Sequence, residues 1–175
     1  GCAMAVFIPS VKPEEFNNSY GEMKVYEALR TLSDQYTVFY SLSWVGINGK
    51  RTVGEADFVI VHPAKGIFVI EVKSGEIEYK NGEWIQTNTK SGQSKRIEPY
   101  VQARKSQFEL LDRLNQGIRD FRIPMMCYGV WFPSIDISEE ATLPPESPKE
   151  ITLDRLSLEN AEKAINDAFA YWAEK

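Results

Sequence analysis

Two short apolar segments, 56–61 and 67–73, constrain the fold of this chain more than any other part of the sequence. Both are rich in Val, Ile and Phe, and only the residues HPAKG separate them. A connection this short predicts an antiparallel pair of neighbouring strands, because parallel strands need a long crossover. We therefore expect a β-hairpin near the middle of the chain.

The alternation of side chains along this hairpin brings two acidic residues together. With the turn centred on Ala64, Asp57 faces Glu71 across the strands, with Cβ atoms roughly 5 Å apart. Lys73 lies two residues beyond Glu71 and so projects from the same face. A register slip of one residue would move Asp57 and Glu71 to opposite faces. The neighbouring residues, which point the other way, are uniformly apolar: Phe58, Ile60, Ile70 and Val72.

Like charges in directly opposite positions destabilise a sheet unless another group neutralises them. A divalent cation does this, and carboxylate oxygens are ligands suited to Mg²⁺ or Mn²⁺. Lys73 beside such an ion would orient a water or stabilise negative charge on a phosphate. One interpretation is therefore a site that cleaves phosphodiester bonds. The alternative is a surface salt-bridge cluster in which Lys73 pairs with Glu71 or Glu55.

Composition excludes several other classes of protein. The chain has 175 residues, of which 43% are hydrophobic and 26% charged, as expected for one folded soluble domain. The single histidine, His62, and two cysteines exclude ordinary zinc fingers and HExxH proteases. We expect His62 to be a turn residue, the protein to be cytoplasmic, and no membrane to be among its partners.

The remaining segments predict an α/β domain with one mixed sheet flanked by helices. Ser19 to Glu22 form a capping box, which indicates a helix over 20–33. Asn81-Gly82 indicates a second hairpin. The other expected elements are a strand over 36–44, a polar loop over 87–97, a helix from Pro99 to Gly117, a buried strand over 124–132, and a short strand followed by a helix over 151–175.

The net charge of −5 does not indicate a nucleic-acid-binding protein, but the charge is unevenly distributed. Between residues 88 and 105 there are five basic residues and one acid, Glu98. This segment is either a phosphate-binding patch or a solvated loop and helix start. Trp84, beside it, either stacks on a base or belongs to the core. The basic residues are Lys90, Lys95, Arg96, Arg104 and Lys105.

The hairpin motif resembles the NERD (nuclease-related) domain, a family of the PD-(D/E)XK nucleases. Ala56-Asp57 stands at the P-D position, and Glu71-Val72-Lys73 matches the E-x-K. The proline is absent, a departure that touches no metal ligand. Gly21-Glu22 matches the Gly-Glu of the family's first helix, and 99–102 (PYVQ) matches its Pro-x-x-Gln.

This resemblance implies a restriction-endonuclease-like fold and metal-dependent hydrolysis of DNA, with RNA as an alternative substrate. Asp57, Glu71, the carbonyl of Val72 and Glu22 would hold Mg²⁺ or Mn²⁺. Lys73 would position or help deprotonate the attacking water. Gln102 would orient Lys73 or contact substrate. The five basic residues of 88–105 would contact the phosphates.

The resemblance covers roughly residues 18–133 and divides the chain accordingly. We expect an N-terminal arm at 1–17, with 1–3 a cloning remnant, and a connection, strand and helix at 134–175 that pack on the core. NERD domains often accompany helicases, so we expect an N-terminal domain of a longer, helicase-like DNA-processing protein. A homodimer is a further expectation.

Each assignment has an alternative. Glu22 either completes the capping box or points inward with the apolar stripe of its helix. Gln102 lies opposite a stripe that we predict to be apolar, and could be an ordinary exposed helical residue. That stripe is Val101, Arg104, Phe108 and Leu111. The whole domain could also be a non-catalytic module that binds nucleic acid or docks a protein.

Overall fold

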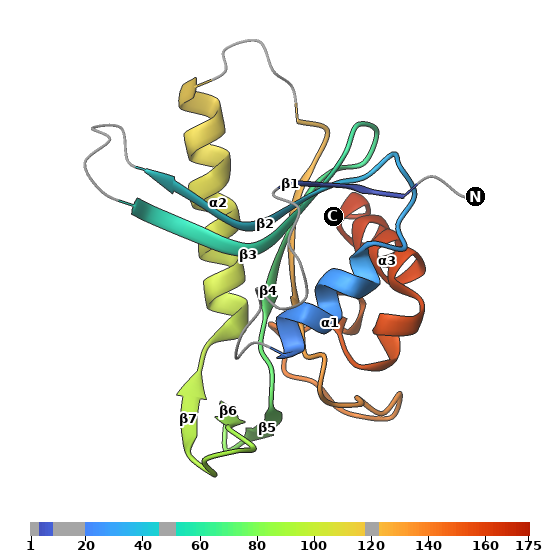
Figure 1. The fold of residues 1–175 in the computed structure, drawn as a ribbon. Coiled ribbons are helices and arrows are strands. Elements are labelled where there is room, and N and C mark those ends of the chain that lie inside the picture. The colour runs from blue at the N-terminus through green and yellow to red at the C-terminus, as the bar shows by residue number, and fades with distance from the viewer. Residues whose placement is uncertain (1–3, 9–19, 46–51, 118–122) are drawn as a thin grey trace.

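The structure, a computed structural model, describes residues 4–8, 20–45, 52–117 and 123–175. Its main feature is a six-stranded mixed sheet in the order β1-β2-β3-β4-β8-β9 (Figure 1). Strands β5, β6 and β7 form a second, smaller sheet. The strands are β1 (Val6–Ile8), β2 (Thr37–Val45), β3 (Thr52–His62), β4 (Gly66–Val72), β5 (Glu76–Lys80), β6 (Glu83–Thr87), β7 (Ser94–Ile97), β8 (Met126–Trp131) and β9 (Thr152–Leu153). The α-helices are α1 (Tyr20–Leu29), α2 (Pro99–Gly117) and α3 (Ala161–Ala173).

The central hairpin of β3 and β4 has the register that the sequence predicts. Val59 pairs with Val69 and Val61 with Ile67, in antiparallel orientation. β2 is antiparallel to β3, whereas β4 pairs in parallel with β8. The predicted mixed α/β architecture is therefore confirmed, and it is consistent with a restriction-endonuclease-like fold.

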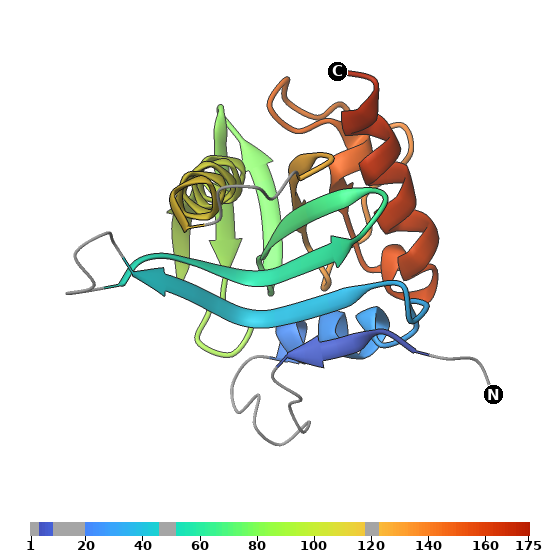
Figure 2. The same ribbon diagram turned by 90° about the horizontal axis from the view of Figure 1, so that it is seen from above.

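Helices cover both faces of the large sheet (Figures 1 and 2). α1 and α3 lie on one face, over a core that includes Phe58, Phe68 and Ile70. α2 lies on the other face, where Leu110 packs with Val59 and Val69. The alternation of side chains along β3 and β4 thus supplies both cores, because successive residues point to opposite faces.

The small sheet contains one confirmed expectation and one correction. Asn81 and Gly82 form the turn between β5 and β6, and both have positive φ, as that turn requires. The polar segment 87–97 was expected to be a loop, yet its last residues form β7, in which Ile97 pairs with Trp84. Ile97 is buried, so a single apolar residue at the end of the segment anchors the strand.

α2 has the predicted limits but presents a different face to the core. Val101 and Phe108 are 58% and 52% exposed, although the sequence placed them on the apolar stripe. Ala103 and Leu110 are buried instead. The guanidinium of Arg104 lies over the ring of Phe108, 5.5 Å from its centre, which shields part of that ring from water.

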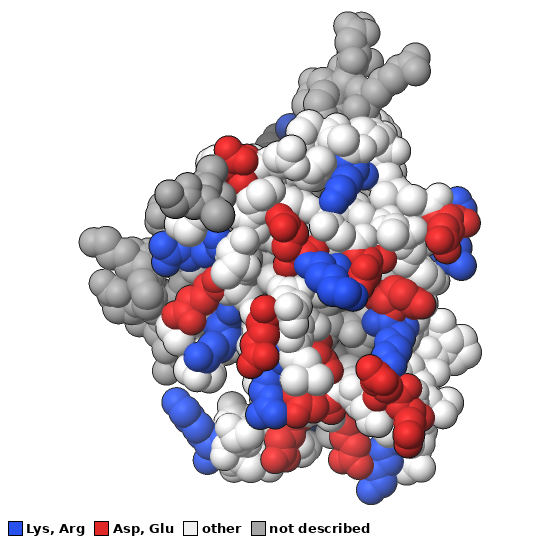
Figure 3. Space-filling view, turned by 90° about the vertical axis from the view of Figure 1, so that its right-hand side faces the viewer, with Lys and Arg blue, Asp and Glu red and all other residues white. Residues whose placement is uncertain are grey.

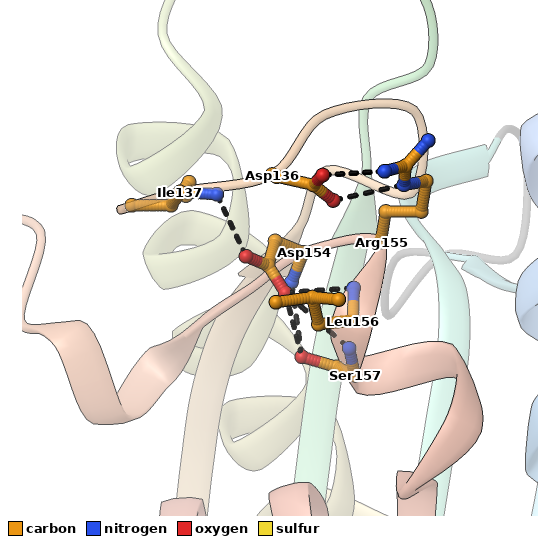
Figure 4. Close-up of polar contacts among 6 residues, drawn as sticks. All are labelled: Asp136, Ile137, Asp154, Arg155, Leu156 and Ser157. Atoms are coloured by element: carbon orange, nitrogen blue, oxygen red, sulfur yellow. Dashed lines mark hydrogen bonds and ion pairs between the residues drawn. The ribbon is translucent and has the colours of Figure 1, made fainter. Parts of the chain in front are cut away.

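The chain after β8 is held to the domain by Asp154 (Figure 4). Its carboxylate accepts hydrogen bonds from the backbone N–H groups of Ile137 at 2.8 Å and Leu156 at 3.0 Å. Its carbonyl accepts a bond from the indole of Trp131 at 2.9 Å. Arg155 and Asp136 form an exposed ion pair beside it. Asp154 thereby joins the connection at 137 to the 3₁₀-helix Leu156–Glu159 that precedes α3.

The expected N-terminal arm contains a strand, since β1 pairs in parallel with β2. Residues 1–3 and 9–17 of the arm, and Ser19 of the predicted capping box, lie outside the described residues. The turn expected at 46–49 lies outside them too. Among the helices that the structure describes, none has the length and apolar character needed to cross a membrane.

Candidate active site

Asp57 lies where the central hairpin opens. The backbone pairing of β3 with β4 extends as far as Phe58 and Ile70. Beyond this pair, the Asp57 side chain bonds to the backbone of β4. Its Oδ2 accepts a hydrogen bond of 2.8 Å from the N–H of Val72. On the other side of β3, Ser41 of β2 has a φ of 53°, a left-handed conformation that is rare for serine. The sheet is therefore irregular next to Asp57, as is common at functional sites.

Glu71 and Lys73 occupy the end of β4. The Nζ of Lys73 lies 3.4 Å from Oε1 of Glu71, and the two side chains are only 16% and 12% exposed. The N–H of Lys73 also donates to the carbonyl of Trp131 at 3.0 Å, which fixes the strand end against β8. The alternation predicted from the sequence thus brings Glu71 and Lys73 into contact. This contact is also the ion pair of the alternative interpretation.

Glu22 reaches the same region from α1. Tyr40 of β2 donates a hydrogen bond of 2.9 Å to its Oε2, so Glu22 points toward the sheet. Gly21 explains how α1 comes so close, because a Cβ at this position would lie 1.8 Å from Oγ of Ser74. Only glycine permits this approach of the helix to the end of β4. The inward orientation of Glu22 is thus found, whereas the capping-box alternative involves Ser19, which lies outside the described residues.

Charge repulsion between these carboxylates shows in the acid–base behaviour of Asp57. Burial and the negative charges of Glu71 and Glu22 raise the pKa of Asp57 from 3.8 to about 7, against the opposing effects of the Val72 N–H and Lys73. Burial and the neighbouring Glu22 also raise the pKa of Tyr40. A divalent cation would reverse the effect on Asp57, because it stabilises the ionised carboxylate.

The donor set suits one kind of metal better than others. Within the described residues, no group of three or more His, Cys, Asp or Glu side chains converges closely enough to enclose an ion. Mg²⁺ does not need such a group, since it keeps several waters and binds through one or two carboxylates plus substrate phosphates. Asp57 and Glu71 provide such a pair. The N–H of Val72 donates its hydrogen bond to Asp57. The role of the Val72 carbonyl as a metal ligand stays a prediction.

The five predicted phosphate-binding residues separate into two groups. Lys90 and Lys95 line a cleft of about 970 Å³ that also contains Tyr20, Gly21 and Ser74. The others are engaged elsewhere: Arg96 forms ion pairs with Glu83 and Glu98, Lys105 pairs with Glu109, and Arg104 lies over Phe108. Lys90 and Lys95 are therefore the basic residues of the set that line this cleft, whose residues Gly21 and Ser74 are the chain neighbours of Glu22 and Lys73.

Three further residues that the sequence singled out are Trp84, His62 and Gln102. Trp84 is buried and packs on Phe132, with ring centres 5.2 Å apart, so it belongs to the core. His62 is a turn residue, as expected: its Nδ1 accepts hydrogen bonds from the N–H groups of Ala64 and Lys65. Gln102 is exposed on α2, and its role toward Lys73 stays a prediction.

Three residues of the site were not predicted from the sequence. Tyr40 binds Glu22, Ser74 contacts Gly21, and Tyr20 lines the cleft. Tyr40 has no local signal, because its partner comes from another element. Ser74 follows Lys73 and Tyr20 precedes Gly21, two residues on which the family resemblance rests. Their neighbours in the sequence therefore hinted at their place in the site.

Of the comparisons with known proteins, the one with protein-family models agrees with this geometry. A search of curated proteins and a search of solved structures each found no match to this chain. The family model for NERD, the nuclease-related domain, matches residues 17–131. The match includes α1, the central hairpin, the small sheet and α2, and it ends with β8. The chain therefore belongs to the nuclease-related domain family, within the PD-(D/E)XK superfamily.

Proposed function

We propose that this protein hydrolyses DNA phosphodiester bonds with the help of Mg²⁺ or Mn²⁺. The observation that carries the proposal is the meeting of Asp57, Glu71 and Lys73 at the open end of the central hairpin. Asp57 and Glu71 would hold the cation, with Glu22 acting through water and the Val72 carbonyl as a further ligand. A bound divalent ion would lower the pKa of a water and stabilise charge on the phosphate.

The side chains that would surround a bound cation would also position the reactants. Lys73 orients the attacking water, and its ammonium group offsets the negative charge that grows on the phosphate oxygens. Glu71 holds Lys73 in place through their 3.4 Å contact. The N–H of Val72 fixes the Asp57 carboxylate. Such preorganisation means that little rearrangement is needed as charge develops.

The test is cleavage of circular and linear DNA, single- and double-stranded, with Mn²⁺ or Mg²⁺. The matched variants are Asp57→Ala and Lys73→Ala, and Lys163→Ala serves as the control. Lys163 is an exposed lysine of α3 that pairs with Asp167, on an element that supplies no residue to the site. We expect activity in wild type and control, and a loss of at least about a hundredfold in the two site variants, as for loss of a preorganised charge.

The outcomes separate the candidate functions. Activity that EDTA abolishes and both site variants lack would support the metal nuclease. Activity that the variants retain would contradict it, since a contaminant would then be responsible. Inactivity of a protein that still binds DNA would favour a non-catalytic binding module. Repeating the assay with a helicase domain attached would test the proposed place in a longer protein.

A further inference from the structure

The cleft beside the site points to the form of the substrate. We infer that this cleft, lined by Tyr20, Ser74, Gln86, Lys90 and Lys95 and called here the Ser74 cleft, binds an unpaired nucleic-acid strand next to the scissile phosphate. The inference rests on the proposed nuclease function, since it concerns how that site receives its substrate. It assigns single strands, overhangs or flaps as the preferred substrate class.

The floor of the cleft continues directly from the proposed catalytic lysine. Ser74 and Gly75 follow Lys73, and Gln86 of β6 donates a 2.6 Å hydrogen bond to the carbonyl of Ser74. Gly75 has a φ of 83°, and a Cβ there would lie 2.8 Å from the carbonyl oxygen of Thr87. The floor is therefore tightly packed between β4 and β6. Gly21 and Ser74 of the cleft lie next to Glu22 and Lys73 in the chain, so a strand bound there would lie beside the proposed site.

One wall of the cleft supplies fixed positive charge. It consists of the loop between β6 and β7 and the start of β7. In the loop, the Asn88 side chain accepts hydrogen bonds from the N–H groups of Lys90 and Ser91. The Asn88 backbone also bonds to Gln93 and Gly92. Lys90 and Lys95 are exposed, and neither pairs with a carboxylate among the residues described. A wall with two unneutralised lysines, Lys90 in the ordered loop and Lys95 in β7, is suited to phosphate contacts.

Another part of the cleft lining supplies an aromatic ring. Tyr20, at the start of α1, is 65% exposed, and Lys24 lies over its ring at 5.1 Å from the centre. Exposed aromatic rings beside basic side chains are how proteins hold single strands, by stacking on bases while contacting phosphates. In a duplex the base faces are covered by their neighbours. Tyr20 can therefore stack only on an unpaired or terminal base.

A face formed by α1 and α3 offers no comparable arrangement. Figure 3 shows acidic and basic side chains interspersed there. On α3, for example, Lys163 pairs with Asp167 at 2.8 Å. Paired charges of this kind attract a phosphate backbone weakly, because each cation is already offset. The Ser74 cleft, by contrast, is lined by the unpaired lysines Lys90 and Lys95 and by the exposed ring of Tyr20.

The test is binding of fluorescein-labelled oligo-dT and of the same strand in a dT·dA duplex, measured by anisotropy in EDTA so that no cleavage occurs. We expect the single strand to bind at least about tenfold more tightly than the duplex. Tyr20→Ala should weaken single-strand binding about tenfold, the effect of losing one stacked base, and Tyr20→Phe should not. Removing Lys90 and Lys95 together should reduce the slope of log K against log salt concentration for the single strand by about 1.4.

The controls use residues outside the cleft. Tyr79→Ala removes a half-exposed ring on β5, and Lys163→Ala removes an exposed charge on α3, so both should bind oligo-dT like wild type. Equal affinity for the duplex, or equal losses in Tyr20→Ala and Tyr79→Ala, would overturn the inference. Cleavage that depends on Asp57 would in that case still support the nuclease. Selective oligo-dT binding without cleavage would instead contradict only the catalytic proposal.

Discussion

At the residue scale, Asp57 lowers the free energy of unfolding by an amount that depends on pH. Its pKa of about 7 exceeds the usual 3.8, so the folded protein retains a proton that the unfolded chain releases. Stability of the metal-free protein therefore declines as pH rises from about 4 to about 7, and it stays low above that range. The decline is caused mainly by the burial of Asp57, with repulsion from Glu71 and Glu22 adding to it.

Asp57→Asn should remove this effect, because the amide has no charge and can still accept the bond from Val72. We expect the variant to be more stable than wild type at pH 8 in EDTA, on the order of 3 kcal/mol, and to differ little at pH 4. Thermal or urea unfolding at the two pH values measures this. A variant less stable than wild type at pH 8 would contradict the assigned electrostatics.

Part of the site could be predicted at this scale, and part could not. Asp57, Glu71 and Lys73 follow from the alternation of side chains and from one short connection, which together fix their register. Glu22 could be placed on a helix face, but its partner Tyr40 lies on a strand 18 positions away. Contacts of this kind depend on how elements pack, which no local pattern specifies.

At the scale of elements, Gly21 sets the distance between α1 and the end of β4. Gly21→Ala should push the helix away from Ser74, lower stability by about 1–3 kcal/mol, and displace Glu22. Adding Ser74→Gly removes the two closest atoms and should restore much of the lost stability. A double-mutant cycle by chemical denaturation measures this coupling. Additive effects would show that Gly21 and Ser74 do not limit the approach.

Asp154 acts at the same scale, because it joins the connection after β8 to the turn before α3 (Figure 4). Asp154→Ala leaves several backbone N–H groups without their acceptor and should cost about 2–4 kcal/mol of stability. Asp136→Ala breaks only the exposed pair with Arg155 and should cost less than about 1 kcal/mol. Equal losses of stability in the two variants would contradict this distinction.

The positions of most helices and strands could be predicted from the sequence. Which face of a helix is buried could not always be predicted. Proline at 99 and glycine at 117 delimit α2, and Asn81-Gly82 specifies a hairpin, because each residue type has its own conformational preference. The buried face of α2 was mispredicted, since Val101 and Phe108 are apolar but exposed. Strand β7 was missed because its residues are polar and only pairing with β6 makes them a strand.

At the scale of the whole molecule, a net charge of −5 conceals where the charges lie. The acids at the hairpin end and the two lysines of the Ser74 cleft lie around one part of the fold, at α1, β4 and the small sheet. A cation bound by the acids would reduce the negative potential there. We therefore expect divalent metal to strengthen DNA binding as well as permit cleavage.

The central claim is that Asp57 and Glu71 hold a divalent metal. Titration of Mn²⁺ into the protein, followed by electron paramagnetic resonance of the free ion, measures this without requiring turnover. The account predicts saturable binding by wild type and by the surface control Asp167→Asn, and binding weakened at least about tenfold in Asp57→Asn and Glu71→Gln. Equal Mn²⁺ binding by all four proteins, or none by wild type with substrate DNA present, would contradict it.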